Sequence, residues 1–497
     1  MRWGLQNLWS DDHEGGYAVR HGGRPARDFG PAASTRAGTI TDDLSTSADA
    51  ENFFEKAFPC MFPYGRGGIE AVRRVNVDFR NHVRWALQYH DRRFRKHETF
   101  PFVSFGMLQR REGLQSAKIQ MRRRDFDTVA AQLSTLTVDK LKRAQQEEEN
   151  GQAFSDPAVR TLRKHVHAVA GRVVGCDSAR YRYRSQIWST CAVFGAPSAW
   201  ITINFSDTHD PIAQIFAGEN IDMDAFLRTL GPDRDQRGRN IAADPYAAAK
   251  FFHFMAKTVF ETLFKIKVSQ FQVSSDTGVL GDVAAYFGTV ESQGRGTLHL
   301  HMLLWLKNTP PPEQMAEMLK TEEFRAKVVA YIRANMRAYV PGLESAETVA
   351  AIPREKDLAY NRPPNPNAAD HAEQVRDFEV RLARSEQVHK CQIKRCMFPN
   401  KFGRLVCKRK APFELAQDAF VTEAGKWGPK RLFGLVNGWC PHILVNARCN
   451  NDAKLLTNGR DTKNITFYVT SYAAKKQGRN YNMSAVMAGK QPQSSLP

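Results

Sequence analysis

The chain has 497 residues, 42% of them hydrophobic, so it can bury sizeable cores and has room for two to four domains of roughly 100–200 residues. Lys and Arg number 71 against 52 Asp and Glu, giving a formal net charge of +19 and making a polyanion the default partner. No stretch approaches the roughly 18 apolar residues of a membrane helix and no secretory pattern opens the chain, so we expect neither a membrane nor a secretory route.

The first 175 residues predict a flexible segment followed by a helical region. Residues 1–50 are rich in Gly, Asp, Arg and Ser, without sustained periodicity. Residues 51–175 predict a mainly helical DNA-binding region, with helices near 79–89, 129–146 and 157–174. Several cations there predict one exposed basic helical surface, which is either a phosphate-binding patch or simply a solvated face. They are Arg110, Arg111, Lys118, Arg122, Arg123 and Arg124.

Residues 176–345 predict a compact α+β core. Residues 200–205 alternate as a strand does, and 247–267 have the spacing of a long amphipathic helix. Two apolar runs, 283–290 and 298–306, flank a glycine-containing segment and predict a β-hairpin. Residues 313–339 then predict a helix.

The remaining chain predicts a series of smaller parts. A linker at 346–385 contains the Pro- and Asn-rich connector 361–367. A Cys/His segment at 386–420 precedes a region at 421–483 with a last helix near 465–477, and 484–497 form a flexible tail.

Two histidines separated by one residue lie inside an apolar strand, as His299-Leu300-His301. Alternation puts both imidazoles on one face, about 7 Å apart, which suits two ligands of one metal ion. Two histidines on a half-exposed strand are the simpler alternative. The pattern alone therefore leaves both readings open.

Two tyrosines four residues apart are followed by a group of cations. In a helix, Tyr468 and Tyr472 lie on one face a turn apart, beside Lys475, Lys476 and Arg479. A phenol has a pKa near ~10, so as a nucleophile it needs a polarised electrophile such as a metal-bound phosphodiester. A packed aromatic pair is the alternative.

Eight cysteines are too few for a disulfide scaffold in so long a chain, and most lie late in it, so metal binding in a reducing compartment is favoured. One group has the composition of a Cys₃His zinc site, and reduced structural cysteines are the alternative. The group is His389, Cys391, Cys396 and Cys407, with Cys440, His442 and Cys449 as further candidates.

Taken together, these motifs resemble the Rep nuclease part of Helitron rolling-circle transposases, a branch of the HUH endonucleases, over about 53–481. Residues 62–65 and 91–94 look like the start of the Helitron-like amino-terminal domain, and 199–211 are similar to the first Rep motif. Residues 291–301 match the metal-binding motif closely. Residues 450–452 and 468–472 occupy the place of the two-tyrosine motif.

The resemblance implies an α+β fold: an HUH-type antiparallel sheet with flanking helices, after a helical region and before a small zinc-binding segment. It also implies metal-dependent cleavage and transfer of single-stranded DNA at transposon ends. His299 and His301 would hold Mg²⁺ or Mn²⁺ with Gln293 as the expected third ligand and Glu291 as the alternative. Tyr468 or Tyr472 would attack, leaving a 5′-phosphotyrosine; related Helitron proteins also carry a similar Cys/His segment, which favours structural zinc.

The chain departs from the resemblance in one respect. Helitron transposases continue into a Pif1-like helicase, but the phosphate-loop pattern G-x-x-x-x-G-K-[ST] does not occur here. A truncated, inactive relic that only binds DNA and an enzyme with a helicase supplied in trans are both compatible with this. A plasmid-type relaxase or replication initiator is a third interpretation. Residence in a eukaryotic nucleus is expected from the family, since no basic run is a clear import signal.

Overall fold

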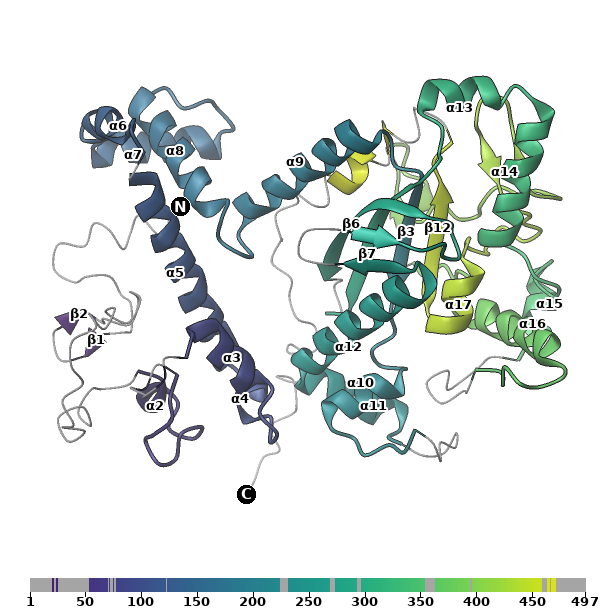
Figure 1. Ribbon diagram of the computed structural model, residues 1–497, viewed down its shortest axis with the longest axis horizontal. Coiled ribbons are helices and arrows are strands. Elements are labelled where there is room, and N and C mark those ends of the chain that lie inside the picture. Colours follow the sequence, from purple (N-terminus) through teal and green to yellow (C-terminus); the bar gives the residue numbers. More distant parts are fainter. Residues whose placement is uncertain are drawn as a thin grey trace. The chain divides into compact units, whose positions relative to one another are not determined.

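The computed structural model describes two compact units, formed by residues 1–182 and 183–497 (Figure 1). The described residues are 20–21, 24–25, 53–69, 71, 75, 77–121, 123–223, 231–268, 273–292, 296–353, 363–393, 396–457, 463–464 and 466–470. The predicted flexible segments at 1–50 and 484–497 lie outside them, except for a short pair of strands, β1 (Arg20–His21) and β2 (Arg24–Pro25).

The N-terminal unit is helical, as the sequence predicts. Its helices are α2 (Phe53–Ala57), α3 (Phe79–Leu87), α4 (Arg93–Lys96), α5 (Phe100–Met121), α6 (Phe126–Leu133), α7 (Val138–Glu149) and α8 (Pro157–Ala170). The segment 129–146, expected to be one helix, is divided between α6 and α7. The division follows from Thr137, whose backbone is extended and therefore does not continue the helix. Its side-chain oxygen accepts a hydrogen bond from the Lys140 amide and so caps the start of α7.

An aromatic cluster forms the core around α2, α3 and α5. Phe54 and Phe100 are almost fully buried, with ring centroids 6.0 Å apart. Edge-to-face contacts of this kind add to the free energy of burying the rings. Arg111 lies over the Phe79 ring at 4.2 Å, so it covers this core, whereas Arg110 and Lys118 are exposed on α5. The expected basic surface is therefore smaller than predicted, and Arg123 and Arg124 lie beyond the end of the helix.

A four-stranded antiparallel sheet organises the second unit, in the order β12-β3-β7-β6 (Figure 1). Its strands are β3 (Ala199–Asn204), β6 (Val283–Ser292), β7 (Leu298–Leu306) and β12 (Asn450–Leu455). The predicted hairpin is confirmed as β6 and β7. The expected core boundary near 345 is wrong, because β12 comes from much later in the chain and pairs with β3 along its full length.

Helices cover both faces of this sheet. On one face, buried residues of α10 (Pro211–Ala217), α12 (Pro245–Thr258), α14 (Glu322–Asn335) and α17 (Pro441–Ala447) form the main core with Ile201, Ile203 and Met302. On the other face, Ile187 of α9 (Asp177–Phe194) packs with Leu303, Trp305 and Val469. The apolar side chains thus alternate between two cores, as expected for a sheet buried on both sides.

Two predicted helices are shorter than expected. The segment 247–267 is helical only through α12 and a π-helical turn, η2 (Val259–Leu263), before it becomes β4 (Ile266–Val268), which pairs with β5 (Val273–Ser275). The segment 313–339 forms α13 (Pro312–Met318) and α14. The spacing of apolar residues in the sequence remains helical beyond the points where these helices end. The ends are decided instead by backbone pairing and capping.

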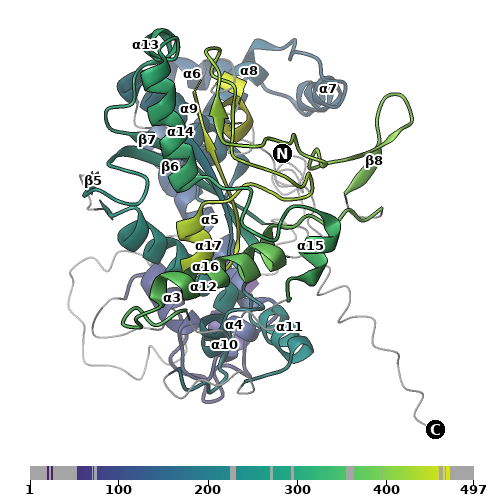
Figure 2. The same ribbon diagram turned by 90° about the vertical axis from the view of Figure 1, so that its right-hand side faces the viewer.

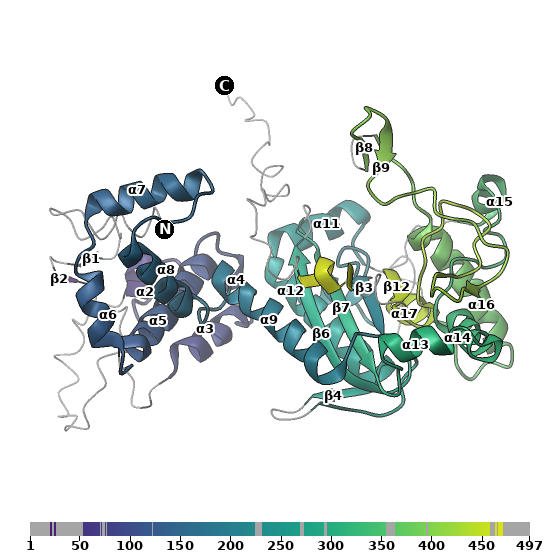
Figure 3. The same ribbon diagram turned by 90° about the horizontal axis from the view of Figure 1, so that it is seen from above.

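The remaining elements include α11 (Arg234–Ala243), α15 (Ala346–Ala351), α16 (His371–Leu382), η4 (Ala383–Gln387), β8 (Met397–Pro399), β9 (Leu405–Cys407), β10 (Phe420–Val421) and β11 (Trp427–Gly428). Helices α16 and α17 pack together around Trp439 (Figure 2). The β8–β9 hairpin projects away from the four-stranded sheet (Figure 3). None of the helices in the described ranges combines the length and apolarity needed to cross a bilayer.

Candidate functional site

One end of the sheet face that packs on α9 is polar. Strand alternation places His299 and His301 of β7 on this face, and Trp200, Thr202 and Asn204 of β3 beside them. Glu291 of β6 pairs directly with His299. The sequence predicted the histidines and Glu291, but not the three β3 residues, although their two-residue spacing already placed them on one face.

His299 is held by a chain of hydrogen bonds that crosses three strands. Its Nδ1 bonds to the Asn204 side-chain oxygen. The Asn204 amide nitrogen donates to Asn450 Oδ1 at 2.9 Å, and Asn450 Nδ2 donates to the carbonyl oxygen of Glu386 at 2.8 Å. Because that carbonyl can only accept, each amide has one orientation, and His299 must carry its proton on Nδ1. Its Nε2 keeps a free lone pair, which is the form that binds a metal ion.

His301 lies between Thr202 and Glu291. Its Nδ1 is 3.4 Å from Thr202 Oγ1, and its Nε2 is 3.5 Å from Glu291 Oε2. Neighbouring ligand atoms of one octahedral ion with bonds of about 2.1 Å would be about 3.0 Å apart. The 3.5 Å between His301 Nε2 and Glu291 Oε2 is close to that spacing, so a small movement would let them share an ion. The His299 ring centroid is 4.4 Å from that of His301.

Burial keeps both imidazoles neutral. Burial, together with smaller effects of positive charge on His301 and Arg409, lowers the pKa of His299 to about 3. Burial also lowers the pKa of His301, with Glu291 opposing the shift. Neutral nitrogen donors beside a carboxylate fit a hard to borderline divalent cation, so this donor set is chemically suited to Mg²⁺ or Mn²⁺.

Tyr468 lies next to this site through Trp200. The indole of Trp200 stacks on His301 with ring centroids 6.0 Å apart, and the Tyr468 ring meets the indole edge-on at 5.8 Å. The backbone is helical at 466–470, where Val469 is buried with Leu303 and Trp305 while Tyr468 remains 41% exposed. The buried valine therefore anchors a helix that places the Tyr468 ring against Trp200, the residue that stacks on His301.

Several predicted site residues lie outside the described part of the chain. They are Gln293, Tyr472, Lys475, Lys476 and Arg479. Of the two candidates for the third ligand, the described one, Glu291, contacts His301.

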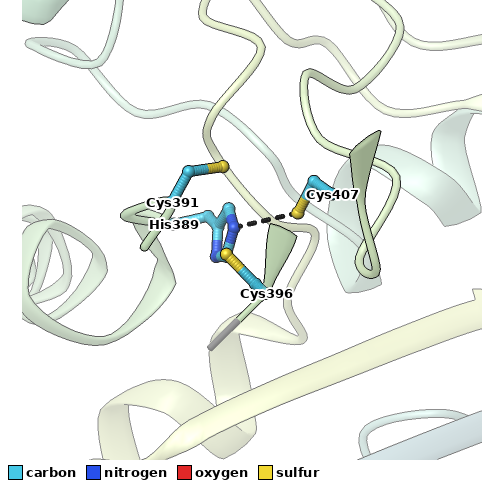
Figure 4. Close-up of side chains that lie close together, drawn as sticks. All are labelled: His389, Cys391, Cys396 and Cys407. Carbon is cyan, nitrogen blue, oxygen red and sulfur yellow. Dashed lines mark hydrogen bonds between the residues drawn. The ribbon is translucent and has the colours of Figure 1, made fainter. Parts of the chain in front are cut away.

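The predicted Cys₃His residues come together in a second cluster (Figure 4). The donor atoms of His389, Cys391, Cys396 and Cys407 all lie within 4.8 Å of one another, and His389 Nε2 is 3.3 Å from Cys407 Sγ. Sulfur ligands of a tetrahedral zinc ion with bonds of about 2.3 Å would be about 3.8 Å apart. Burial lowers the pKa of His389, which keeps it neutral, and this set could hold one ion with little movement.

The further zinc candidates do not join this cluster. Cys440 and Cys449 are fully buried in the main core, and burial raises the pKa of both thiols. His442 is likewise not among the clustered donors in the described residues. Prediction of these three as ligands is therefore wrong, and the two cysteines serve as small apolar side chains.

The acidic residues after β3 have a structural role. Asp210 caps α10 by accepting from the Ile212 amide at 2.9 Å, and it pairs with Arg448 at 3.1 Å. Arg448 directly precedes Cys449 and β12, so this ion pair links the ends of β3 and β12. Burial raises the pKa of nearby Asp207 to about 6.

These features define an α+β protein whose central sheet carries a candidate metal site next to an exposed tyrosine. The family model described as the Helitron helicase-like domain at the N-terminus matches residues 82–304. The protein is therefore Helitron-related, as the sequence motifs predict. The match includes β3, β6, most of β7 and both histidines, and it ends before the Cys₃His cluster, β12 and Tyr468. No curated protein matches the chain.

Proposed function

We propose that this protein is a metal-dependent endonuclease and strand transferase of the HUH type, which acts on single-stranded DNA at transposon ends. The observation that carries the proposal is the packing of Tyr468 against Trp200, which in turn stacks on His301. Trp200 thus links a phenol to a neutral histidine pair on one face of the sheet. Together they supply a nucleophile and a metal-ligand set, which a DNA-binding protein without chemistry does not need.

Each residue has a defined part in this proposal. His299, His301 and Glu291 hold a divalent cation, which when bound polarises the scissile phosphate. Hydrogen bonding fixes His299 through Asn204, and Trp200 positions Tyr468. The Tyr468 oxygen attacks phosphorus and gives up its proton to solvent, the bond to the 3′ oxygen breaks, and that oxygen takes up a proton from solvent and leaves as a hydroxyl. A 5′-phosphotyrosine remains, and Tyr472 supplies the second phenol for strand transfer.

The Cys₃His cluster is proposed to bind structural zinc. The four side chains would fill all four coordination positions of a tetrahedral zinc ion, so no position is left open for a substrate. Three of the four side chains are buried. The partners of such an enzyme are single-stranded DNA and a Pif1-like helicase in trans or in a longer chain. Its expected compartment is the nucleus.

The test is formation of a covalent protein–DNA adduct that resists SDS. The full chain is incubated with labelled single-stranded oligonucleotides of varied sequence and Mn²⁺, beside Tyr468→Phe, Tyr472→Phe and His299→Ala variants. Tyr331→Phe is the matched control, because this phenol is partly buried and donates to the Leu280 carbonyl, away from the histidines.

We expect an adduct with the native chain and Tyr331→Phe, and its loss in His299→Ala and in one or both site tyrosine variants. A folded, DNA-binding protein that forms no adduct over the whole oligonucleotide pool would instead identify an inactive relic. An adduct that survives in Tyr468→Phe, Tyr472→Phe and the double variant would refute a tyrosine nucleophile.

A further inference from the structure

The β8–β9 hairpin is closed at its base by the Cys₃His cluster. Cys396 precedes β8 and Cys407 ends β9, and Met397 pairs with Cys407 across the two strands. At the tip, the Asn400 side chain accepts from the amides of Phe402 and Arg404, at 2.9 and 3.0 Å. Gly403 has a φ of 74°, which suits glycine in so tight a turn. The tip is therefore a preformed structure.

The hairpin exposes apolar side chains instead of burying them. Phe402 at the tip is 74% exposed, and Phe398 on β8 is also exposed. Ile393 and Leu405 add to the same feature. Exposed aromatic rings on a rigid hairpin are a platform on which nucleic-acid bases can stack.

The sequence around the hairpin carries only positive charge. From Val388 to Phe413 there is no Asp or Glu, and there are eight Lys and Arg residues. Six of them are exposed among the described residues: Lys390, Lys401, Arg404, Lys408, Arg409 and Lys410. None of these six forms an ion pair within the described ranges, and Lys401 instead lies 4.9 Å from the Phe402 ring. Aromatic rings interleaved with unpaired cations suit a phosphate backbone with unstacked bases.

The base of the hairpin is near the histidine site. The Glu386 carbonyl that orders Asn450, and through it Asn204 and His299, lies three residues before the cluster ligand His389. The start of the Cys₃His segment is therefore joined to the histidine site by a short stretch of chain and a hydrogen bond.

We propose that the β8–β9 hairpin is a single-stranded DNA-binding arm, in which Phe402 and Phe398 stack on bases and Lys401 and Arg404 contact phosphates. The arm holds the substrate strand beside the sheet. This inference rests on the proposed function for the identity of the substrate, but it concerns binding, which requires neither a metal-activated phosphate nor a phenol. The two can therefore fail separately.

The test measures binding in a full chain that cannot cleave, Tyr468→Phe with Tyr472→Phe, without added Mn²⁺. Fluorescence anisotropy gives the affinity for an oligothymidine, and 5-iododeoxyuridine in the same sequence gives photo-crosslinks that are mapped by mass spectrometry. We expect Phe402→Ala to weaken binding at least about fivefold, Phe402→Trp to restore it, and crosslinks to map to Phe402 or Phe398. Lys401→Ala with Arg404→Ala should lower the slope of log K against log salt by about 1.4 for two lost phosphate contacts.

The matched control removes two cations elsewhere in the same unit, Lys257→Ala with Lys320→Ala. Each of these lysines already pairs with a glutamate, so we expect little change in affinity. Zinc content and thermal unfolding verify that each hairpin variant is folded. Unchanged binding in folded hairpin variants, or an equal loss with the control pair, would overturn the proposal. A loss confined to duplex DNA or to RNA would overturn the assignment to single-stranded DNA.

Discussion

Asn204 and His299 face each other across the two central strands, and the asparagine oxygen accepts a hydrogen bond from the imidazole Nδ1. The amide of Asn204 is itself oriented by Asn450. The protonation of one histidine nitrogen is therefore decided by residues on two other parts of the chain. Such partners of metal-binding histidines influence affinity strongly.

Replacing Asn204 with alanine should weaken metal binding at the histidine pair about tenfold to a hundredfold, because the His299 ring loses its orientation. The measurement is the Mn²⁺ concentration that gives half-maximal adduct formation. Asn446→Ala is the control, since Asn446 is exposed on α17 and bonds only to the His442 carbonyl in the described structure. An unchanged Mn²⁺ requirement in Asn204→Ala would argue against the role of this bond.

Trp200→Ala should reduce adduct formation by about a hundredfold, because the ring that separates Tyr468 from His301 is lost and the phenol is no longer held in position. Trp200→Phe keeps an aromatic ring and should recover part of the rate. Single-turnover kinetics with saturating DNA separate this effect from binding. If both variants cleaved at the native rate, Trp200 would be only a packing residue.

Removing the zinc ligands should release one metal ion per chain. We expect His389→Ala and Cys407→Ser to lose zinc, measured by atomic absorption, and to lower the melting temperature. Cys449→Ser should retain the ion, because its fully buried thiol lies outside the cluster. Cys60→Ser, an exposed cysteine of the other unit, is a second control. Full zinc content after loss of Cys407 would refute the site.

Two buried carboxyls should each make a contribution to stability that falls as the pH rises from about 4 to 7, opposite to the contribution of the buried histidines, whose pKa values are lowered. Burial raises the pKa of Asp207 to about 6 and that of Glu386 to about 7. A carboxyl with a raised pKa binds its proton more tightly in the folded state, so its favourable contribution is present at low pH and is lost as the pH rises through these values. Each ionisation costs up to about 3 kcal/mol.

Chemical denaturation at a series of pH values checks this expectation. Asp207→Asn and Glu386→Gln should each remove one of these falling contributions, so the stability of the variant relative to the native chain should increase with pH, while Asp235→Asn, at an exposed position, should leave the difference constant. A Glu386→Gln profile that runs parallel to the native one would contradict the assignment.

Short-range patterns in the sequence predicted the local features well. Alternation in 298–306 identified the strand that carries both histidines, and the spacing of His389 to Cys407 identified the metal cluster. These features could be predicted because a strand's period spans a few residues and the four clustered side chains lie in one short segment. The family expected from these motifs agrees with the match over 82–304.

Long-range relationships could not be predicted in the same way. Nothing local in Asn450 indicates that it would pair opposite Asn204, 246 residues away, since pairing depends on the register of two distant strands. The wrong boundary near 345 has the same cause. Likewise, Cys440 and Cys449 have the composition of metal ligands, and only their burial in the core excludes them from the cluster.

The late position of β12 has a consequence for synthesis. On a ribosome, β3 and β7 emerge long before residues 450–455, so β3 remains an edge strand with unpaired backbone groups for much of translation. Asn450 is also synthesised only at that stage. Until then, the Asn204 side chain that bonds to His299 is not oriented by Asn450. A nascent chain therefore carries an incomplete metal site, and fragments that end before Leu455 should aggregate and bind Mn²⁺ poorly.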